Sequence, residues 1–123
     1  MKKIYLWPAQ GFGDAICLNA LIRNICDEYD LVYLFCSEHF CKSIKWMFRD
    51  IKNLNFISVP YPSHYVWEQT IINFINQENL KVYELTEVGK IKSSGGQLDG
   101  DSVIKVGIQH DFCLLYTSDA ADD

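Results

Sequence analysis

The chain has 123 residues, a net charge of −5 and a hydrophobic share of 49%. This composition is typical of one globular domain and excludes a disordered chain, and the acid excess excludes the strongly basic surface of a nucleic-acid-binding protein. No apolar run reaches the roughly 18 residues of a membrane span, and the apolar stretch before Pro8 is too short for the core of a signal peptide. We therefore expect a cytoplasmic protein with no transmembrane segment and no nucleic-acid partner.

The first half of the chain alternates strand and helix patterns. Residues 2–7 are a predicted strand that Pro8 ends, and residues 14–28 carry apolar side chains at helical spacing. The continuous apolar run 31–36 predicts a strand covered on both faces. Ser37 is expected to cap a helix over 38–48, with Glu38 in its first turn. The apolar faces of the two helices comprise Leu18, Leu21, Ile22 and Ile25 in the first, and Phe40, Ile44 and Met47 in the second.

The second half continues the alternation. Residues 55–59 predict a strand, and residues 64–78 predict a helix whose apolar face carries Trp67, Ile71, Phe74 and Ile75. Residues 81–85 predict another strand, the Gly- and Ser-rich stretch 89–101 a loop, and residues 103–108 a last strand. Strands that alternate with helices predict an α/β fold, a parallel sheet with helices on both faces.

The cysteines indicate reduced thiols in the core of a cytoplasmic protein. There is no C-x-x-C pair. Cys36, His39 and Cys41 are close together in the sequence, but a zinc site needs four ligands and no second cluster supplies the rest. No metal site is expected.

The loop over 8–13 is the default ligand site, because ligands bind beyond the carboxyl ends of strands in an open parallel sheet. Gly11 and Gly13 allow a tight turn and a close approach of the backbone to a ligand. They match a dinucleotide fingerprint only in part, since Ile16 occupies the third glycine position. The carboxylate of Asp14 would compete with a pyrophosphate for the helix N-terminus, so a neutral hydroxyl-bearing ligand fits better, with Asp14 as a general base.

The strand, the G-x-G-D string and the apolar helix together resemble the start of the lipopolysaccharide heptosyltransferases and their relatives. Small glycosyltransferase-like proteins of marine bacteria and phages are more similar still, through FGDAICLNALIR (12–23), LFCSEHF (34–40) and KWMFRDIKNLN (45–55). The resemblance implies a GT-B glycosyltransferase, with two Rossmann-like domains facing across a cleft. It implies that Asp14 deprotonates a sugar-containing acceptor, that Gly11 and Gly13 shape the loop, and that the nucleotide-sugar donor binds mainly in a C-terminal domain.

Several residues have a functional and a structural interpretation. Asp14 is also a good helix N-cap, and Asn19 either reaches the site loop or bonds a backbone carbonyl. Glu38 is either the acidic partner of a ribose or a charge in a first helical turn. Other residues receive structural roles: Arg23 on a solvated face, and Trp46, Met47 and Phe48 in the core. The tyrosines of YPSHY (61–65) are candidates for stacking on a sugar. The predicted substrate-binding set is Gln10, Gly11, Phe12, Gly13 and Asn19, with Asp14 as the catalytic residue.

The last eleven residues, CLLYTSDAADD, resemble a translated sequencing-library adapter of the kind appended to metagenomic reading frames. Without the three acidic residues of this tail the net charge is −2. The predicted organisation is therefore a truncated Rossmann-like N-terminal domain over 1–112 and a non-native tail over 113–123.

Three functional hypotheses follow. The first is the acceptor-side part of an inverting, nucleotide-sugar-dependent glycosyltransferase of hexosyl or heptosyl type, inactive as a fragment and without a cofactor of its own. The second is a non-catalytic Rossmann-like module that binds a nucleotide or small ligand. The third is an interrupted chain with no function.

Overall fold

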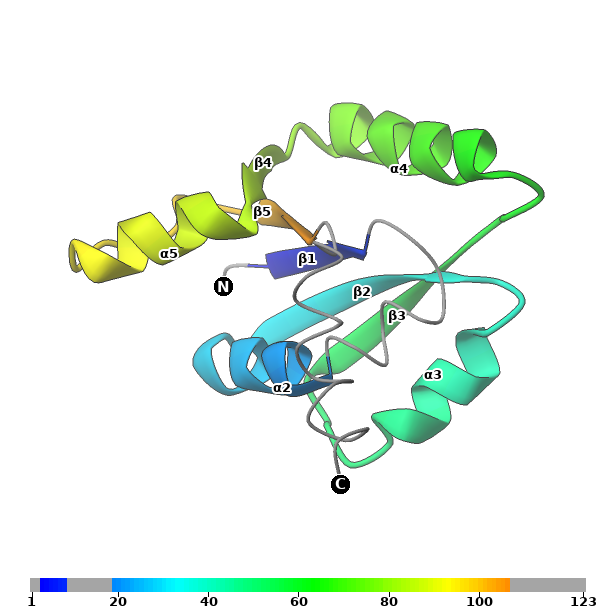
Figure 1. The fold of residues 1–123 in the computed structure, drawn as a ribbon, viewed down its shortest axis with the longest axis horizontal. Coiled ribbons are helices and arrows are strands. Elements are labelled where there is room, and N and C mark those ends of the chain that lie inside the picture. The colour runs from blue at the N-terminus through cyan, green and yellow to red at the C-terminus, as the bar shows by residue number, and fades with distance from the viewer. Residues whose placement is uncertain (1–2, 9–18, 107–123) are drawn as a thin grey trace, which may run out of the picture.

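The computed structural model describes residues 3–8 and 19–106 (Figure 1). Strands and helices alternate along the described chain, as the sequence predicts. The elements are β1 (Lys3–Pro8), α2 (Asn19–Glu28), β2 (Leu31–Ser37), α3 (Cys41–Met47), β3 (Leu54–Val59), α4 (His64–Glu78), β4 (Lys81–Glu84), α5 (Leu85–Ser93) and β5 (Ser102–Val106).

The five strands form one parallel sheet in the order β3-β2-β1-β5-β4. The predicted α/β class with a Rossmann-like parallel sheet is confirmed. The β3-β2-β1 half has the order of a doubly wound fold, in which β4 would be the next strand beside β1. Here β5 occupies that position and β4 is the outer strand. β1 is therefore central, with β2 on one side and β5 on the other.

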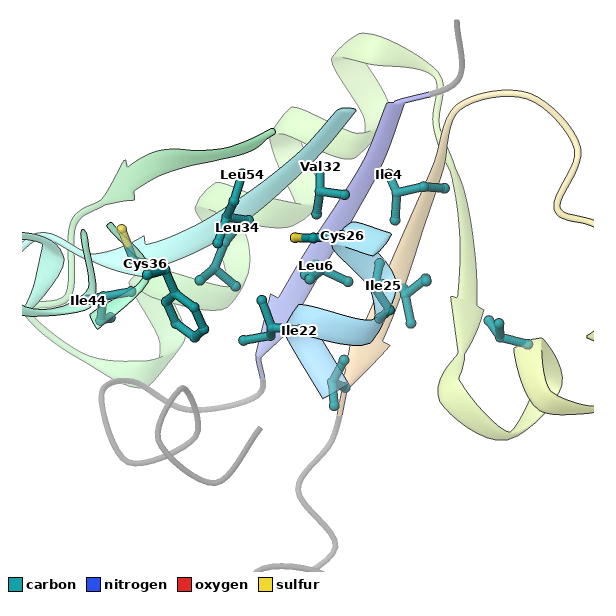
Figure 2. Close-up of a cluster of buried hydrophobic side chains, with 14 of the residues drawn as sticks. Ile4, Leu6, Ile22, Ile25, Cys26, Val32, Leu34, Cys36, Ile44 and Leu54 are labelled. Carbon is teal, nitrogen blue, oxygen red and sulfur yellow. The ribbon is translucent and has the colours of Figure 1, made fainter. Parts of the chain in front are cut away.

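Helices cover both faces of the sheet. Alternate side chains along each strand point to opposite faces, and apolar side chains lie on both of them. Figure 1 shows α4 on one side and α2 and α3 on the other. In β1, Ile4 and Leu6 belong to the cluster formed with α2, α3 and α5, whereas Tyr5 and Trp7 belong to the cluster formed with α4. Figure 2 shows the first cluster, where α2 lies over β1 and β2. Both faces of the sheet are apolar, as the continuous run of β2 predicts.

The predicted helices over 14–28 and 64–78 are present where the structure describes them. Ile22 and Ile25 of α2 are buried, as are Trp67, Ile71 and Ile75 of α4. The Ser63 hydroxyl caps α4 by accepting a hydrogen bond from Val66 N at 3.3 Å. At the other end Asn79 takes a left-handed conformation with φ 54° and ends the helix. Residues 14–18 lie outside the described residues.

The predicted helix over 38–48 is wrong at its start. Ser37 stays in β2, paired with Val59, and its hydroxyl accepts a hydrogen bond from His39 N at 3.3 Å. This turn carries Glu38 ahead of the helix, and α3 begins only at Cys41. The prediction of a buried Trp46 is also wrong: its side chain is 67% exposed and stacks on Arg49, with the guanidinium carbon 3.9 Å from the ring centroid.

The predicted loop over 89–101 is wrong in its first part, where the chain forms α5 over Leu85–Ser93. The helix begins directly after β4, so no turn residues separate the two elements. Glu87 in the first turn and Lys90 and Lys92 in the last turn complement the helix dipole. Val88 is buried, and Lys92 pairs with Glu28 of α2. The loop is confirmed only after residue 93.

Gly89→Ala is expected to raise the free energy of unfolding by about 0.8–1.0 kcal/mol, because alanine favours a helix over glycine by that amount. Gly89 lies inside α5, and a Cβ added there meets nothing within 4 Å. Gly95 is the matched control: its φ of +80° disfavours a side chain, so Gly95→Ala should destabilise the protein. Urea denaturation measures both. Equal effects of the two substitutions would contradict a helix at Gly89.

Candidate functional site

The carboxyl edge of the sheet is where a ligand site is expected, and β1 and β5 meet there side by side. The chain passes from β1 toward β2 and β3 on one side, then returns through β4 to β5 on the other. The strand order thus changes direction between β1, which ends at Pro8, and β5, which ends at Val106. Ligands in open α/β sheets bind at such a point.

Most of the predicted site residues follow β1 directly. Gln10, Gly11, Phe12, Gly13 and Asp14 lie outside the described residues, so their roles stay predictions. Asn19 is the first described residue of α2. Its Oδ1 accepts a hydrogen bond from Arg23 Nε at 2.8 Å. Its substrate-binding role also stays a prediction.

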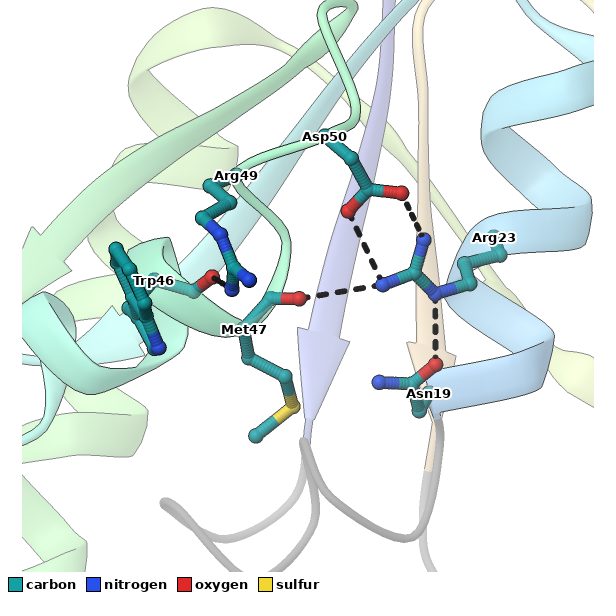
Figure 3. A network of polar contacts seen from close by, with 6 residues as sticks. All are labelled: Asn19, Arg23, Trp46, Met47, Arg49 and Asp50. Atoms are coloured by element: carbon teal, nitrogen blue, oxygen red, sulfur yellow. Dashed lines mark hydrogen bonds and ion pairs between the residues drawn. The ribbon is translucent and has the colours of Figure 1, made fainter.

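Arg23 anchors α2 to the connection between α3 and β3, as Figure 3 shows. Its guanidinium donates to the Asp50 carboxylate at 2.7 and 3.3 Å and to the Met47 carbonyl at 3.2 Å. The guanidinium carbon also lies 5.4 Å from the ring centroid of Phe48. The hydrogen bond from Arg23 lowers the pKa of Asp50 and raises the pKa of Arg23 itself. Arg23 therefore bridges two segments of the chain, whereas the sequence suggested only a residue on a solvated face.

A tyrosine, a histidine and a glutamate line up after β3. Tyr61 Oη lies 3.4 Å from His64 Nδ1, and His64 Nε2 lies 3.3 Å from the carboxylate of Glu68. The glutamate favours a proton on Nε2, which leaves Nδ1 to accept a hydrogen bond from the Tyr61 hydroxyl. His64 and Glu68 are solvent-exposed. Histidine and glutamate at i and i+4 on a predicted helix were the signal for this contact.

Tyr61 and Trp67 are neighbours at the same edge. Their ring centroids lie 5.5 Å apart, and Trp67 is fully buried while Tyr61 is half-buried. Tyr65, the other tyrosine of the YPSHY segment, is 72% exposed and does not join them. One of the two predicted stacking candidates therefore lies against the aromatic core.

A lysine lies beside the point where the strand order changes direction. Lys105 of β5 is the register partner of Trp7 of β1, and its Nζ lies 4.8 Å from the centroid of the Trp7 ring. The pair belongs to the last two positions of both strands. It brings a positive charge to the start of the predicted ligand loop, in a cation–π contact. A single lysine within the apolar run of 103–108 was the sequence signal, which the prediction did not use.

The clearest hollows in the described ranges 3–8 and 19–106 lie away from the carboxyl edge. One of these hollows, at the opposite, amino edge, has a volume of about 520 Å³ and is lined by the Glu28–Lys92 ion pair, Tyr29 and the turn after α5. No group of three or more His, Cys, Asp or Glu side chains in these ranges is arranged to hold a metal ion. Cys36 and Cys41 are in contact, but His39 does not join them in such a group.

Comparison of the chain with protein-family models, with curated proteins and with solved structures finds no match. Among the described residues, none of the helices has the length and apolar character needed to cross a bilayer. The fold class is thus established by the structure itself, and the biochemical role is a proposal from the site.

Proposed function

We propose that this chain is the acceptor-side, Rossmann-like part of an inverting glycosyltransferase that uses a nucleotide-sugar. The single observation that carries the proposal is the position of the G-x-G-D string. It comes directly after β1, the central strand, whose neighbour β5 ends at the same edge. A catalytic carboxylate on this loop would face the crevice in which α/β sheets bind their ligands.

The chemistry of Asp14 suits a hydroxyl group. A carboxylate within hydrogen-bond reach of an acceptor hydroxyl takes the proton as the oxygen attacks the anomeric carbon of the donor. The bond from that carbon to the nucleoside diphosphate breaks, and the sugar is transferred with inversion. Gln10, Phe12 and Asn19 are the residues proposed to hold the acceptor beside Asp14, and Gly11 and Gly13 let the backbone come close to it.

Two described features support a site at this edge. The Lys105 ammonium beside Trp7 supplies a positive charge at the carboxyl ends of the two central strands. The Arg23 network ties α2, the helix that follows the loop, to the α3–β3 connection. An anchored α2 gives a rigid support on the C-terminal side of the predicted ligand loop.

The test uses the reading frame extended beyond codon 112 of the source DNA, expressed with any second domain encoded there. Release of nucleoside diphosphate from a panel of nucleotide-sugars, with sugar acceptors, measures transfer. Asp14→Asn should lower kcat by a factor of about 10²–10⁴, the range of general-base catalysis, and leave the Kd of the donor unchanged. Asp27→Asn is the matched control, because Asp27 is an exposed carboxylate on α2.

An Asp14→Asn enzyme with unchanged kcat would overturn the catalytic role of Asp14. A second outcome favours the alternative function of a non-catalytic binding module. In that case the 123-residue chain itself binds a nucleotide saturably, and the extended frame encodes no second domain or transfers no sugar.

A further inference from the structure

Two buried cysteines meet where β2 leads into α3. Cys36 Sγ lies 2.9 Å from Cys41 Sγ, and both residues are free thiols. A disulfide bond is about 2.05 Å long, so the sulfurs need to approach by only about 0.9 Å to form one. Cys36 is 2% exposed and Cys41 is 9% exposed.

The backbone between the two cysteines holds them in this position. Cys36 is fixed in the sheet by its register with Ser58 of β3. The chain then turns, with Phe40 N donating to Ser37 O at 3.0 Å and His39 N donating to Ser37 Oγ at 3.3 Å. Cys41 follows as the first residue of α3. A strand end, a hydrogen-bonded turn and a helix start thus set the sulfur–sulfur separation.

We propose that Cys36 and Cys41 form a reversible dithiol–disulfide site that low-molecular-weight disulfides such as oxidised glutathione oxidise. The proposal is independent of the glycosyltransferase function. The new bond would join residues 36 and 41 into a small ring at the carboxyl edge, around the turn that connects β2 to α3.

The exchange proceeds in two steps. Cys41, the more exposed thiol, loses its proton and attacks one sulfur of the small disulfide, which releases one small thiolate. Cys36 then loses its proton and attacks the Cys41 sulfur, which releases the second small thiolate. The two cysteines lose two electrons in total, the small disulfide gains them, and the two protons end on the released thiolates.

The order of attack follows from the environment of each thiol. Burial, and the hydrogen bond to Cys41, raise the pKa of Cys36, so this group remains a thiol that donates to the sulfur of Cys41. A thiolate, and not a thiol, attacks a disulfide. Cys36 therefore acts second, when the mixed disulfide on Cys41 places an electrophilic sulfur beside it.

The experiment maps the bond in the intact chain. The native protein is incubated with oxidised glutathione, then denatured, alkylated and digested with trypsin and a glutamate-specific protease. Cleavage after Arg23, Glu28, Glu38 and Lys42 separates the three described cysteines into fragments 24–28, 29–38 and 39–42. We expect fragments 29–38 and 39–42 to be joined, fragment 24–28 with Cys26 to remain outside this link, and dithiothreitol to release the two joined fragments.

Matched variants separate this site from general thiol oxidation. Cys26→Ser should keep the link, because Cys26 is buried elsewhere in α2. Cys41→Ser should abolish it, and the wild-type digest decides the question even where that variant does not fold. Separately alkylated fragments 29–38 and 39–42 in oxidised wild-type protein would overturn the proposal, as would linkage of Cys36 to the fragment of Cys17 or Cys113.

Discussion

Trp67→Ala is expected to lower the free energy of unfolding by about 3–5 kcal/mol, the usual cost of removing a large buried aromatic side chain. Trp67 is 1% exposed and packs within the aromatic cluster between α4 and the sheet. The opposite face is covered by three helices, whereas α4 alone covers this face among the described elements. A cavity under α4 therefore weakens the main cover of one whole face, and urea denaturation measures the loss.

Trp67→Phe is expected to cost less than half as much as the alanine substitution. The Nε1 of Trp67 is buried and has no hydrogen-bond partner within residues 3–8 and 19–106. An unpaired buried donor costs about 1–3 kcal/mol, and phenylalanine removes it while keeping an aromatic ring in place. Trp46→Ala is the tryptophan control. Trp46 is 67% exposed and stacks on Arg49, so its loss should cost at most about 1 kcal/mol.

Equal costs for Trp67→Ala and Trp67→Phe would contradict this account of the indole nitrogen. That result would mean that Nε1 makes a stabilising bond in the folded protein, with a partner beyond the described residues. The Trp46 control decides whether the effect belongs to the buried position or to any tryptophan in the chain.

The sequence predicts the central features of the fold because two periodicities are strong in it. Val32 and Leu34 point to the α2 face of β2 while Tyr33 and Phe35 point to the α4 face, and this produces a continuous apolar run. Such a run requires cover on both faces, which predicts helices on each side of a parallel sheet. The 3.6-residue spacing of apolar residues in α4 is equally clear. The Ser63 side chain caps the start of that helix, and the left-handed backbone of Asn79 ends it.

Two boundaries could not be predicted, because hydrogen bonds at the first and tertiary packing at the second override the local sequence pattern. Serine is a preferred helix N-cap residue. Pairing with Val59 nevertheless keeps Ser37 extended, and its hydroxyl accepts a hydrogen bond from His39 N in the turn before Cys41. α5 contains Gly89 and three β-branched residues, Thr86, Val88 and Ile91, which lowers its helix propensity. Packing of Val88 against the sheet and the Lys92–Glu28 pair stabilise it instead.

The sequence predicts the edge of the sheet at which the candidate site is expected, but it does not predict which side chains meet there. The order of strands and the glycines after β1 indicate the carboxyl edge. Trp7 and Lys105 are far apart in the sequence, and they meet there only because of the strand order. β5 lies beside β1 only because β4 takes the outer position, and no local pattern in the chain encodes that choice.

Leu98→Ala is expected to cost about 2–5 kcal/mol, which is the range for truncating a buried leucine. Leu98 lies in the connection between α5 and β5, a segment rich in glycine and polar residues, yet it is 2% exposed and belongs to the cluster with Val88 and Ile104. Its neighbour Gln97 is exposed, so Gln97→Ala should change stability by no more than about 0.5 kcal/mol. Urea denaturation of the two variants compares adjacent positions in one loop. Equal, small effects would mean that the loop does not close the core beside β5.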